Sequence, residues 1–150
     1  MLNEDYKEII QSLLKHRVKF LIVGAYAMGV HGYPRATGDF DIWIEASKVN
    51  SEKTFKSLLE FGAPLREINE DTFGEEGIIF QIGVVPRRID IITKISGVNF
   101  MEAYPERKIV EVEGIKIPFL SMADLIKNKE AAARPKDKLD VKALKKIKSN

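Results

Sequence analysis

The apolar positions along this chain change their spacing from one stretch to the next, and each spacing predicts an element. Near the start they recur every three or four residues, which is the pattern of a helix with one buried face. Asn3 precedes this stretch, and asparagine readily caps a helix N-terminus. The first predicted element is therefore a helix that packs on a core through Tyr6, Ile9, Ile10, Leu13 and Leu14.

Two strands separated by a short helix are predicted next. The run from Phe20 to Val23 is apolar throughout and stops at Gly24, which is typical of a buried strand. Residues 25–32 are rich in glycine and alanine and suffice for about two helical turns. Residues 39–44 then alternate, so Asp39 and Asp41 are expected on one face of a second strand.

The remaining elements follow from caps, chain breakers and further alternation. A third helix is expected to start at Ser51 and to bury Phe55, Leu58 and Leu59. Residues 66–77 are polar and turn-rich, which predicts a loop. Further predicted elements are strands at 78–83 and 88–93, a hairpin of 108–112 and 115–117, and helices from Ser121 to about Ala133 and from about Asp137 to Lys148.

Helix and strand patterns mix along one chain of 150 residues, and this mixture predicts the fold class. We expect an α/β (α+β) fold with a mixed β-sheet flanked by helices. A chain of this length can bury a core as a single unit. The expectation is one domain over residues 1–150, with 121–150 as a C-terminal helical segment packing on it.

Composition excludes several classes of protein. The chain has no cysteine, so disulfides and thiolate metal sites are excluded. No run approaches the ~18 apolar residues of a membrane span, so no membrane partner is expected. The first ten residues carry acids where a signal peptide would carry bases, and we expect a cytoplasmic protein.

The net charge of +2 is unevenly distributed. Residues 1–120 carry a net charge of −3, whereas residues 121–150 carry nine basic and four acidic residues, a net charge of +5. A basic segment of this size could contact phosphate or RNA. A solvated helix face explains the same charges, and both interpretations stay open.

Three aspartates are the first candidates for chemistry. Asp39, Asp41 and Asp90 each occur in a β-like run whose other face is apolar. Carboxylate oxygens suit Mg²⁺ or Mn²⁺, and two such ions can stabilise both the attacking and the leaving oxygen in phosphoryl transfer. The alternative is that these acids form surface ion pairs with Arg35, Arg87 or Arg88.

The segment around Gly24 and Ala25 adds a second candidate. A glycine directly after a buried strand lets backbone N–H groups approach a phosphate closely, although an ordinary tight turn has the same signature. No Gly-Lys-Ser/Thr follows, so this is not a P-loop. Arg35 and Thr37 either contact phosphate or shape the turn into the strand. Trp43 shares the carboxylate face, where it either stacks on a base or is partly buried at a sheet edge.

These segments together resemble a known superfamily. A strand ending in Gly24, a short helix, R-x-T-x-D-x-D over residues 35–41 and a lone Asp90 in a later strand resemble the nucleotidyltransferases typified by DNA polymerase β. The closing segment, residues 121–140, is similar to the "DLI-x-x-K … R-x-K-D-x-x-D" element of the AbiEii-type toxin branch. The matches span Phe20 to about Leu144.

The resemblance implies a role for each matching residue. Asp39 and Asp41 would bind two metal ions, Mg²⁺ or Mn²⁺, and Asp90 would bind the catalytic one. Gly24 and Ala25 would line a triphosphate, although Ala25 stands where glycine or serine is usual and offers no hydroxyl.

The closing element has implied roles as well. Lys129 would neutralise phosphate charge. Asp137 or Asp140 would orient nearby groups or assist the incoming nucleophile.

The implied activity is transfer of a nucleoside monophosphate from a nucleoside triphosphate to a hydroxyl. The acceptor could be the end of an RNA, a protein side chain or a small molecule, and the resemblance favours a protein or the end of an RNA, reached through the basic C-terminal segment. The toxin resemblance further implies a toxin of a toxin–antitoxin pair, with a cognate antitoxin as partner. The alternative is a catalytically silent module of the same fold that binds nucleotide, RNA or a partner protein.

Overall fold

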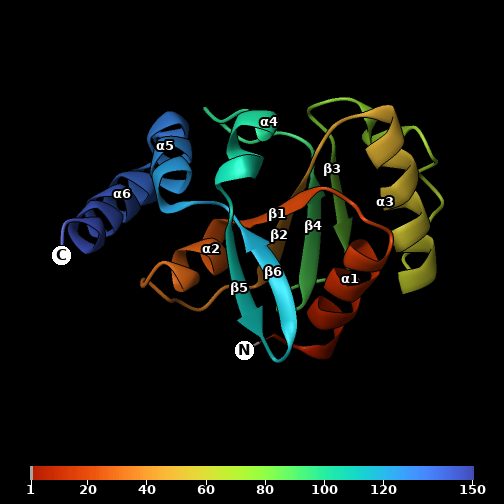
Figure 1. The fold of residues 1–150 in the computed structure, drawn as a ribbon, viewed down its shortest axis with the longest axis horizontal. Helices are drawn as coiled ribbons and strands as arrows, with labels where there is room; N and C mark the ends of the chain where they lie inside the picture. Colours follow the sequence, from red (N-terminus) through yellow and green to blue (C-terminus); the bar gives the residue numbers. More distant parts are fainter. Residues whose placement is uncertain (1) are drawn as a thin grey trace.

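A computed structural model describes residues 2–150 and shows a six-stranded sheet with helices around it (Figure 1). The strand order is β3-β4-β2-β1-β6-β5. The mixed sheet confirms the predicted fold class. The strands are β1 Phe20–Val23, β2 Asp39–Ile44, β3 Ile79–Ile82, β4 Arg88–Ile92, β5 Lys108–Val112 and β6 Ile115–Phe119.

Pairing in the centre of the sheet decides where the candidate site forms. β2 lies between β1, to which it is antiparallel, and β4, to which it is parallel. β6 pairs with β1 in parallel, and both sheet edges, β3 and β5, are antiparallel to their neighbours. The register places Asp41 opposite Asp90 and Asp39 opposite Arg88. Two polar stretches from distant parts of the sequence therefore meet on adjacent central strands.

In Figure 1, α1 and α3 lie on the right, α2, α5 and α6 lie on the left, and the short α4 lies between the two groups at the top. None of the described helices is both long enough and apolar enough to span a membrane. The helices are α1 Glu4–Lys15, α2 Gly24–Val30, α3 Lys48–Phe61, α4 Phe100–Ala103, α5 Met122–Ala132 and α6 Pro135–Lys148, with 3₁₀ turns at Thr72–Gly74 and Tyr104–Glu106.

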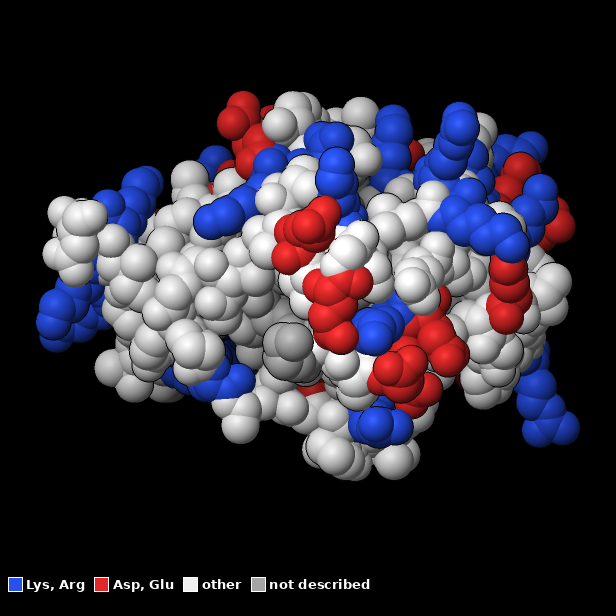
Figure 2. All heavy atoms as spheres, turned by 60° about the horizontal axis from the view of Figure 1, so that its bottom comes forward, with Lys and Arg blue, Asp and Glu red and all other residues white. Residues whose placement is uncertain are grey.

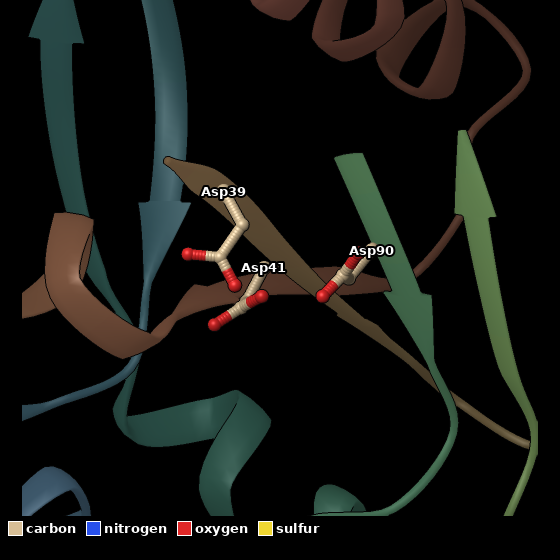
Figure 3. Close-up of side chains that lie close together, drawn as sticks. All are labelled: Asp39, Asp41 and Asp90. Carbon is tan, nitrogen blue, oxygen red and sulfur yellow. The ribbon is translucent and has the colours of Figure 1, made fainter. Parts of the chain in front are cut away.

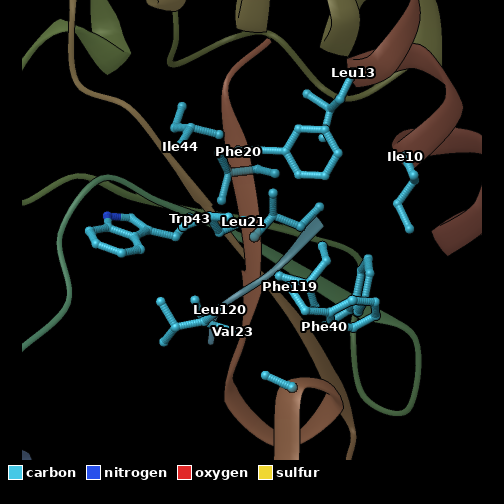
Figure 4. Close-up of a cluster of buried hydrophobic side chains, with 14 of the residues drawn as sticks. Ile10, Leu13, Phe20, Leu21, Val23, Phe40, Trp43, Ile44, Phe119 and Leu120 are labelled. Atoms are coloured by element: carbon cyan, nitrogen blue, oxygen red, sulfur yellow. The ribbon is translucent and has the colours of Figure 1, made fainter. Parts of the chain in front are cut away.

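The core forms where α1 packs on the central strands. The Asn3 side chain accepts a hydrogen bond from the Tyr6 backbone N–H at 2.9 Å, as predicted for a cap. Figure 4 shows α1 residues Ile10 and Leu13 on the same side of β1 as Phe20. These side chains are completely buried, so burial of this face is a main source of stability.

The third helix begins earlier than predicted, and of its predicted buried residues Leu58 is buried, Phe55 is half-buried and Leu59 is exposed. Its N-cap is Ser47, whose side chain accepts from Asn50 N–H, while Ser51 lies fully buried inside the helix. Ser51 Oγ donates to Glu70 O at 2.7 Å and accepts from Phe73 N–H at 2.9 Å. The packed face consists largely of small polar side chains that satisfy neighbouring backbone groups. The apolar pattern misled here, since Leu59 is 58% exposed; the buried residues are Asn50, Ser51, Thr54, Ser57 and Leu58.

Trp43 is completely buried and lies in a central strand, so the prediction of partial burial at a sheet edge was wrong. Its ring meets Phe100 of α4 edge to face, with the centroids 4.9 Å apart. Sequence analysis did not predict α4, which is a single turn. This burial leaves Trp43 no open face on which a base could stack.

Candidate active site

Three carboxylates converge on one face of the central strands. Asp39 and Asp41 project from β2 and Asp90 from β4 toward a common point (Figure 3). One carboxylate oxygen from each residue lies within 4.8 Å of the other two. The predicted convergence is therefore present. The role of these residues as metal ligands stays a prediction.

The local sequence explains why these half-buried or buried acids share one face of the sheet. Alternation along β2 sends Phe40 and Ile42 to the opposite face, where both are fully buried. In β4, Ile89 and Ile91 are likewise buried on the face opposite to Asp90. The apolar faces anchor both strands, so the carboxylates are held on a rigid backbone.

The site carries more negative charge than its neighbours neutralise. Burial raises the pKa of Asp41 to about 7, and the charges of Asp39 and Asp90 add to this effect. Within residues 2–150, no lysine, arginine or histidine lies within ion-pair distance of Asp41. A set of hard oxygen donors with unbalanced charge is the environment that Mg²⁺ or Mn²⁺ requires. The residues present thus fit a divalent ion.

Arg88 supplies the one cation bonded to the cluster in the described part of the chain. Its Nη2 lies 3.1 Å from Asp39 Oδ2, and its Nε lies 3.0 Å from Asp90 Oδ1. The ion-pair interpretation is therefore correct for Arg88. Arg35 and Arg87 do not contact these acids, because Arg35 pairs with Asp140 and Arg87 lies 3.7 Å from Asp5.

Gly24 is packed directly against the carboxylate cluster. Its backbone has φ +69°, and a Cβ atom at this position would overlap Asp41 Oδ2. Both the positive φ and the close approach favour glycine. Sequence analysis singled out Gly24 for phosphate contact, whereas the structure also gives it a steric role beside Asp41.

A cleft of about 840 Å³ opens beside the aspartates. Gly24, Ala25 and Thr37 line it together with Asp39 and Asp41, while Asp90 is not part of its lining. Thr37 Oγ1 donates to Asp39 Oδ1 at 2.8 Å, so this hydroxyl holds the carboxylate in place. The basic side chains of the cleft are Arg35, Lys94, Lys129, Arg134 and Lys136.

Lys129 reaches the cleft wall from α5 but is bound from behind by two acids of α6. Its Nζ lies 3.1 Å from Asp140 and 3.5 Å from Asp137, and the Lys129 side chain is 7% exposed. Arg35 forms a bidentate pair with Asp140 at 2.9 and 3.0 Å. Asp140 thereby ties the loop before β2 to both α5 and α6.

Asp137 and Asp140 are themselves buried and do not line the cleft. Burial opposes ionisation of Asp137, but hydrogen bonds from Arg134 outweigh it and hold the pKa of Asp137 below its ordinary value. A carboxylate committed to Arg134 and Lys129 is poorly placed to accept a proton from an incoming nucleophile. The structure therefore gives the predicted base role no support, and the orienting role stays a prediction.

Comparisons with known proteins bear on the fold. No protein-family model matches the chain, and no curated protein matches it in sequence. Among solved structures, a provisionally assigned nucleotidyltransferase from Thermotoga maritima superposes with a TM-score of 0.62 at 16% identity, over 97% of this chain and 94% of that one. The lincosamide antibiotic adenylyltransferase LnuA, with lincomycin bound, gives a TM-score of 0.62 at 16% identity over 98% of each chain.

The chain has the nucleotidyltransferase fold. The predicted superfamily fold is thus confirmed. The resemblance to the AbiEii-type branch stays a prediction.

Sequence analysis missed three cations of the cleft, which are Lys94, Arg134 and Lys136. Arg134 and Lys136 were quoted as part of the closing motif, but only Lys129 received a phosphate role. A signal existed, because each sits within three residues of an aspartate that the motif marks. Their position on the cleft wall follows from the N-terminus of α6, which begins at Pro135.

Proposed function

We propose that this protein is a metal-dependent nucleotidyltransferase that moves a nucleoside monophosphate from a nucleoside triphosphate to a hydroxyl acceptor. One observation carries the proposal: Asp39, Asp41 and Asp90 place oxygens within 4.8 Å of one another beside a cleft lined with basic side chains. The fold likeness supports the same class, since LnuA is an adenylyltransferase.

The proposed reaction exchanges one phosphorus–oxygen bond for another. The acceptor oxygen forms a bond to the α-phosphorus, and the bond from that phosphorus to the bridging oxygen of the β-phosphate breaks. Pyrophosphate leaves with the electron pair, and the hydroxyl proton passes to solvent. Such chemistry needs positioning and charge stabilisation more than covalent participation by the protein.

Asp39, Asp41 and Asp90 would hold Mg²⁺ or Mn²⁺. When bound, such an ion neutralises phosphate oxygens and lowers the pKa of a coordinated hydroxyl. Thr37 keeps Asp39 oriented through its 2.8 Å hydrogen bond. Gly24 leaves room for Asp41 where any side chain would collide with it.

Basic residues that line the cleft would bind the triphosphate. Lys129 is held in position by Asp137 and Asp140, and Arg134 is paired with Asp137, whereas the exposed Lys136 can adapt to a ligand. The backbone at Gly24 and Ala25 lines the same cleft, in keeping with the predicted phosphate contact. Several cations facing a polyanion favour binding through charge-assisted hydrogen bonds.

The acceptor we favour is the end of an RNA. Support comes from α6, which starts at the cleft and carries exposed lysines along its length, seen as basic side chains at the left end of Figure 2. These lysines are Lys136, Lys138, Lys142, Lys145, Lys146 and Lys148. A protein acceptor, and a toxin role with a cognate antitoxin, rest on the resemblance of residues 121–140 to AbiEii-type toxins.

The test is label transfer with purified protein. Each α-³²P-labelled nucleoside triphosphate is incubated with Mg²⁺ or Mn²⁺ and either total RNA or a protein fraction. Wild-type protein should transfer label and release pyrophosphate, and Asp41→Asn should not. Asp71→Asn, an exposed loop residue, serves as the matched control and should keep activity.

A catalytically silent binding module gives a different result. It transfers no label in any form, and its ligand binding depends on the basic residues after Ser121 and weakens with salt. Absence of transfer to every acceptor, with every triphosphate and both ions, would contradict the enzyme proposal.

A further inference from the structure

Arg88 is bonded to two of the three candidate metal ligands at once. Its Nη2 is 3.1 Å from Asp39 Oδ2 and 3.2 Å from Asp90 Oδ2, and its Nε is 3.0 Å from Asp90 Oδ1. The guanidinium thus joins carboxylates of neighbouring strands. A divalent ion bound by the same oxygens would have to share them with this positive charge or displace it.

The main chain of Arg88 is held by hydrogen bonds, whereas its side chain is partly exposed and can move into solvent. Arg88 N–H donates to Gly38 O at 3.3 Å, and the Tyr6 hydroxyl donates to Arg88 O at 3.2 Å. The side chain is 29% exposed, and its hydrogen bonds to protein are those to Asp39 and Asp90. The head group can therefore leave the carboxylates without disturbing the strand.

We propose that Arg88 is an internal cation that competes with the divalent ion for Asp39 and Asp90 and so sets the metal affinity of the site. The inference rests on the proposed function in taking the three aspartates as metal ligands. Arg88 neutralises part of their charge when no ion is bound. Loading the site requires the ion to break three charge-assisted hydrogen bonds and to displace a like charge.

A purely structural role for Arg88 predicts the opposite effect on metal binding. If the guanidinium only held Asp39 and Asp90 in position for the ion, its removal would let the carboxylates spread and weaken binding. If it competes, its removal strengthens binding. The sign of the change in metal affinity therefore separates the two roles.

The experiment measures Mn²⁺ binding to the full chain by isothermal titration and by electron paramagnetic resonance of free Mn²⁺, without nucleotide. Arg88→Gln should bind Mn²⁺ roughly tenfold more tightly than wild type, since it removes a unit charge a few ångströms from the ion. Arg88→Lys keeps the charge but cannot bridge both carboxylates with a planar fork, so its affinity should lie between the two.

Two further variants make the result interpretable. Arg87→Gln is the matched control, because Arg87 is 58% exposed on the side chain and faces Asp5, and it should leave Mn²⁺ affinity unchanged. Asp41→Asn should abolish binding, which identifies the site. If Arg88→Gln proves too unstable to fold, tighter binding by Arg88→Lys than by wild type supports the proposal on its own.

The outcomes distinguish this inference from the proposed function. Wild-type binding that Asp41→Asn abolishes and that Arg88→Gln leaves unchanged or weakens overturns the competing role and leaves the metal site standing. Binding that appears only when Arg88 is replaced supports the proposal most strongly. No Mn²⁺ binding in any variant, together with no label transfer, overturns both.

Discussion

Asp41 and Asp90 lie opposite each other where β2 and β4 run in parallel. Their side chains leave the same face of the sheet, so two carboxylates emerge side by side from central strands. Burial, followed by the charges of Asp39 and Asp90, raises the pKa of Asp41 to about 7. The charged form of Asp41, which a metal ion would bind, is therefore disfavoured in the folded protein, and the effect on the free energy of unfolding can be measured.

The stability of the metal-free protein should fall as the pH rises from about 4 to about 7. The unfolded chain loses the Asp41 proton near its ordinary pKa of 3.8, whereas the folded protein keeps it until the pH approaches 7. Between these values the folded state binds more protons, so raising the pH favours unfolding. The loss amounts to at most about 4 kcal/mol in the free energy of unfolding. Urea unfolding in chelator across this pH range measures it.

Asp41→Asn should remove that pH dependence. An amide does not titrate, so the variant should be more stable than wild type above pH 7 by up to the same few kcal/mol. Asp71→Asn should keep the wild-type slope, because Asp71 lies exposed in the loop before β3 and is not part of the cluster. A slope in Asp41→Asn equal to that of wild type would assign the effect to another group.

Gly24→Ala should damage both the fold and metal binding. The new Cβ would overlap Asp41 Oδ2, and the backbone would have to keep φ +69°. We expect a loss of about 1–3 kcal/mol in the free energy of unfolding and weaker Mn²⁺ binding, because Asp41 must move. Gly74→Ala is the control, since a Cβ there meets nothing within 4 Å. Unchanged Mn²⁺ binding in Gly24→Ala would contradict the steric role.

Lys129→Ala should destabilise the protein by about 3 kcal/mol, because Asp137 and Asp140 lose a buried counter-charge. Nucleotide affinity, measured by isothermal titration, should fall as well if Lys129 contacts phosphate. Lys127→Ala, on the exposed side of the same helix, should change neither quantity. A loss of stability with full nucleotide affinity would leave Lys129 a structural role only.

Arg35→Lys should loosen the loop that leads into β2. A lysine cannot reproduce the bidentate pair with Asp140, so the anchor to α6 weakens although the charge remains. Hydrogen exchange should become faster over residues 33–38 and stay unchanged in β4. Equal protection in the variant and wild type would mean that other contacts hold the loop.

Local patterns predicted most of the fold, because the spacing of apolar residues that marks a strand or a helix involves only residues that are near one another in the sequence. The strands β1, β2, β3 and β4 and the caps of α1 and α5 follow from such signals. Helix α3 did not, since its buried face is made of small polar residues whose partners are distant in sequence. Tertiary contacts decided that face, not residue type.

In the candidate site, too, local sequence indicates some features and tertiary contacts decide the others. The three aspartates could be predicted because each interrupts an apolar strand pattern. The pair of Arg35 with Asp140 joins residues 105 positions apart, and no local rule indicates it. Arg88 was weighed as one of three candidate ion-pair partners, and only the register of β2 against β4 selects it.

The burial of Trp43 gives the protein a built-in optical reporter. It is the single tryptophan of the chain, it points from β2 to the same face as Asp41, and its indole Nε1 has no hydrogen-bond partner in the described structure. An indole shielded from water in this way emits at short wavelength. Because Asp41 is two residues away on one rigid strand, the emission of unlabelled protein should respond to ions that enter the carboxylate cluster, and paramagnetic Mn²⁺ should quench it.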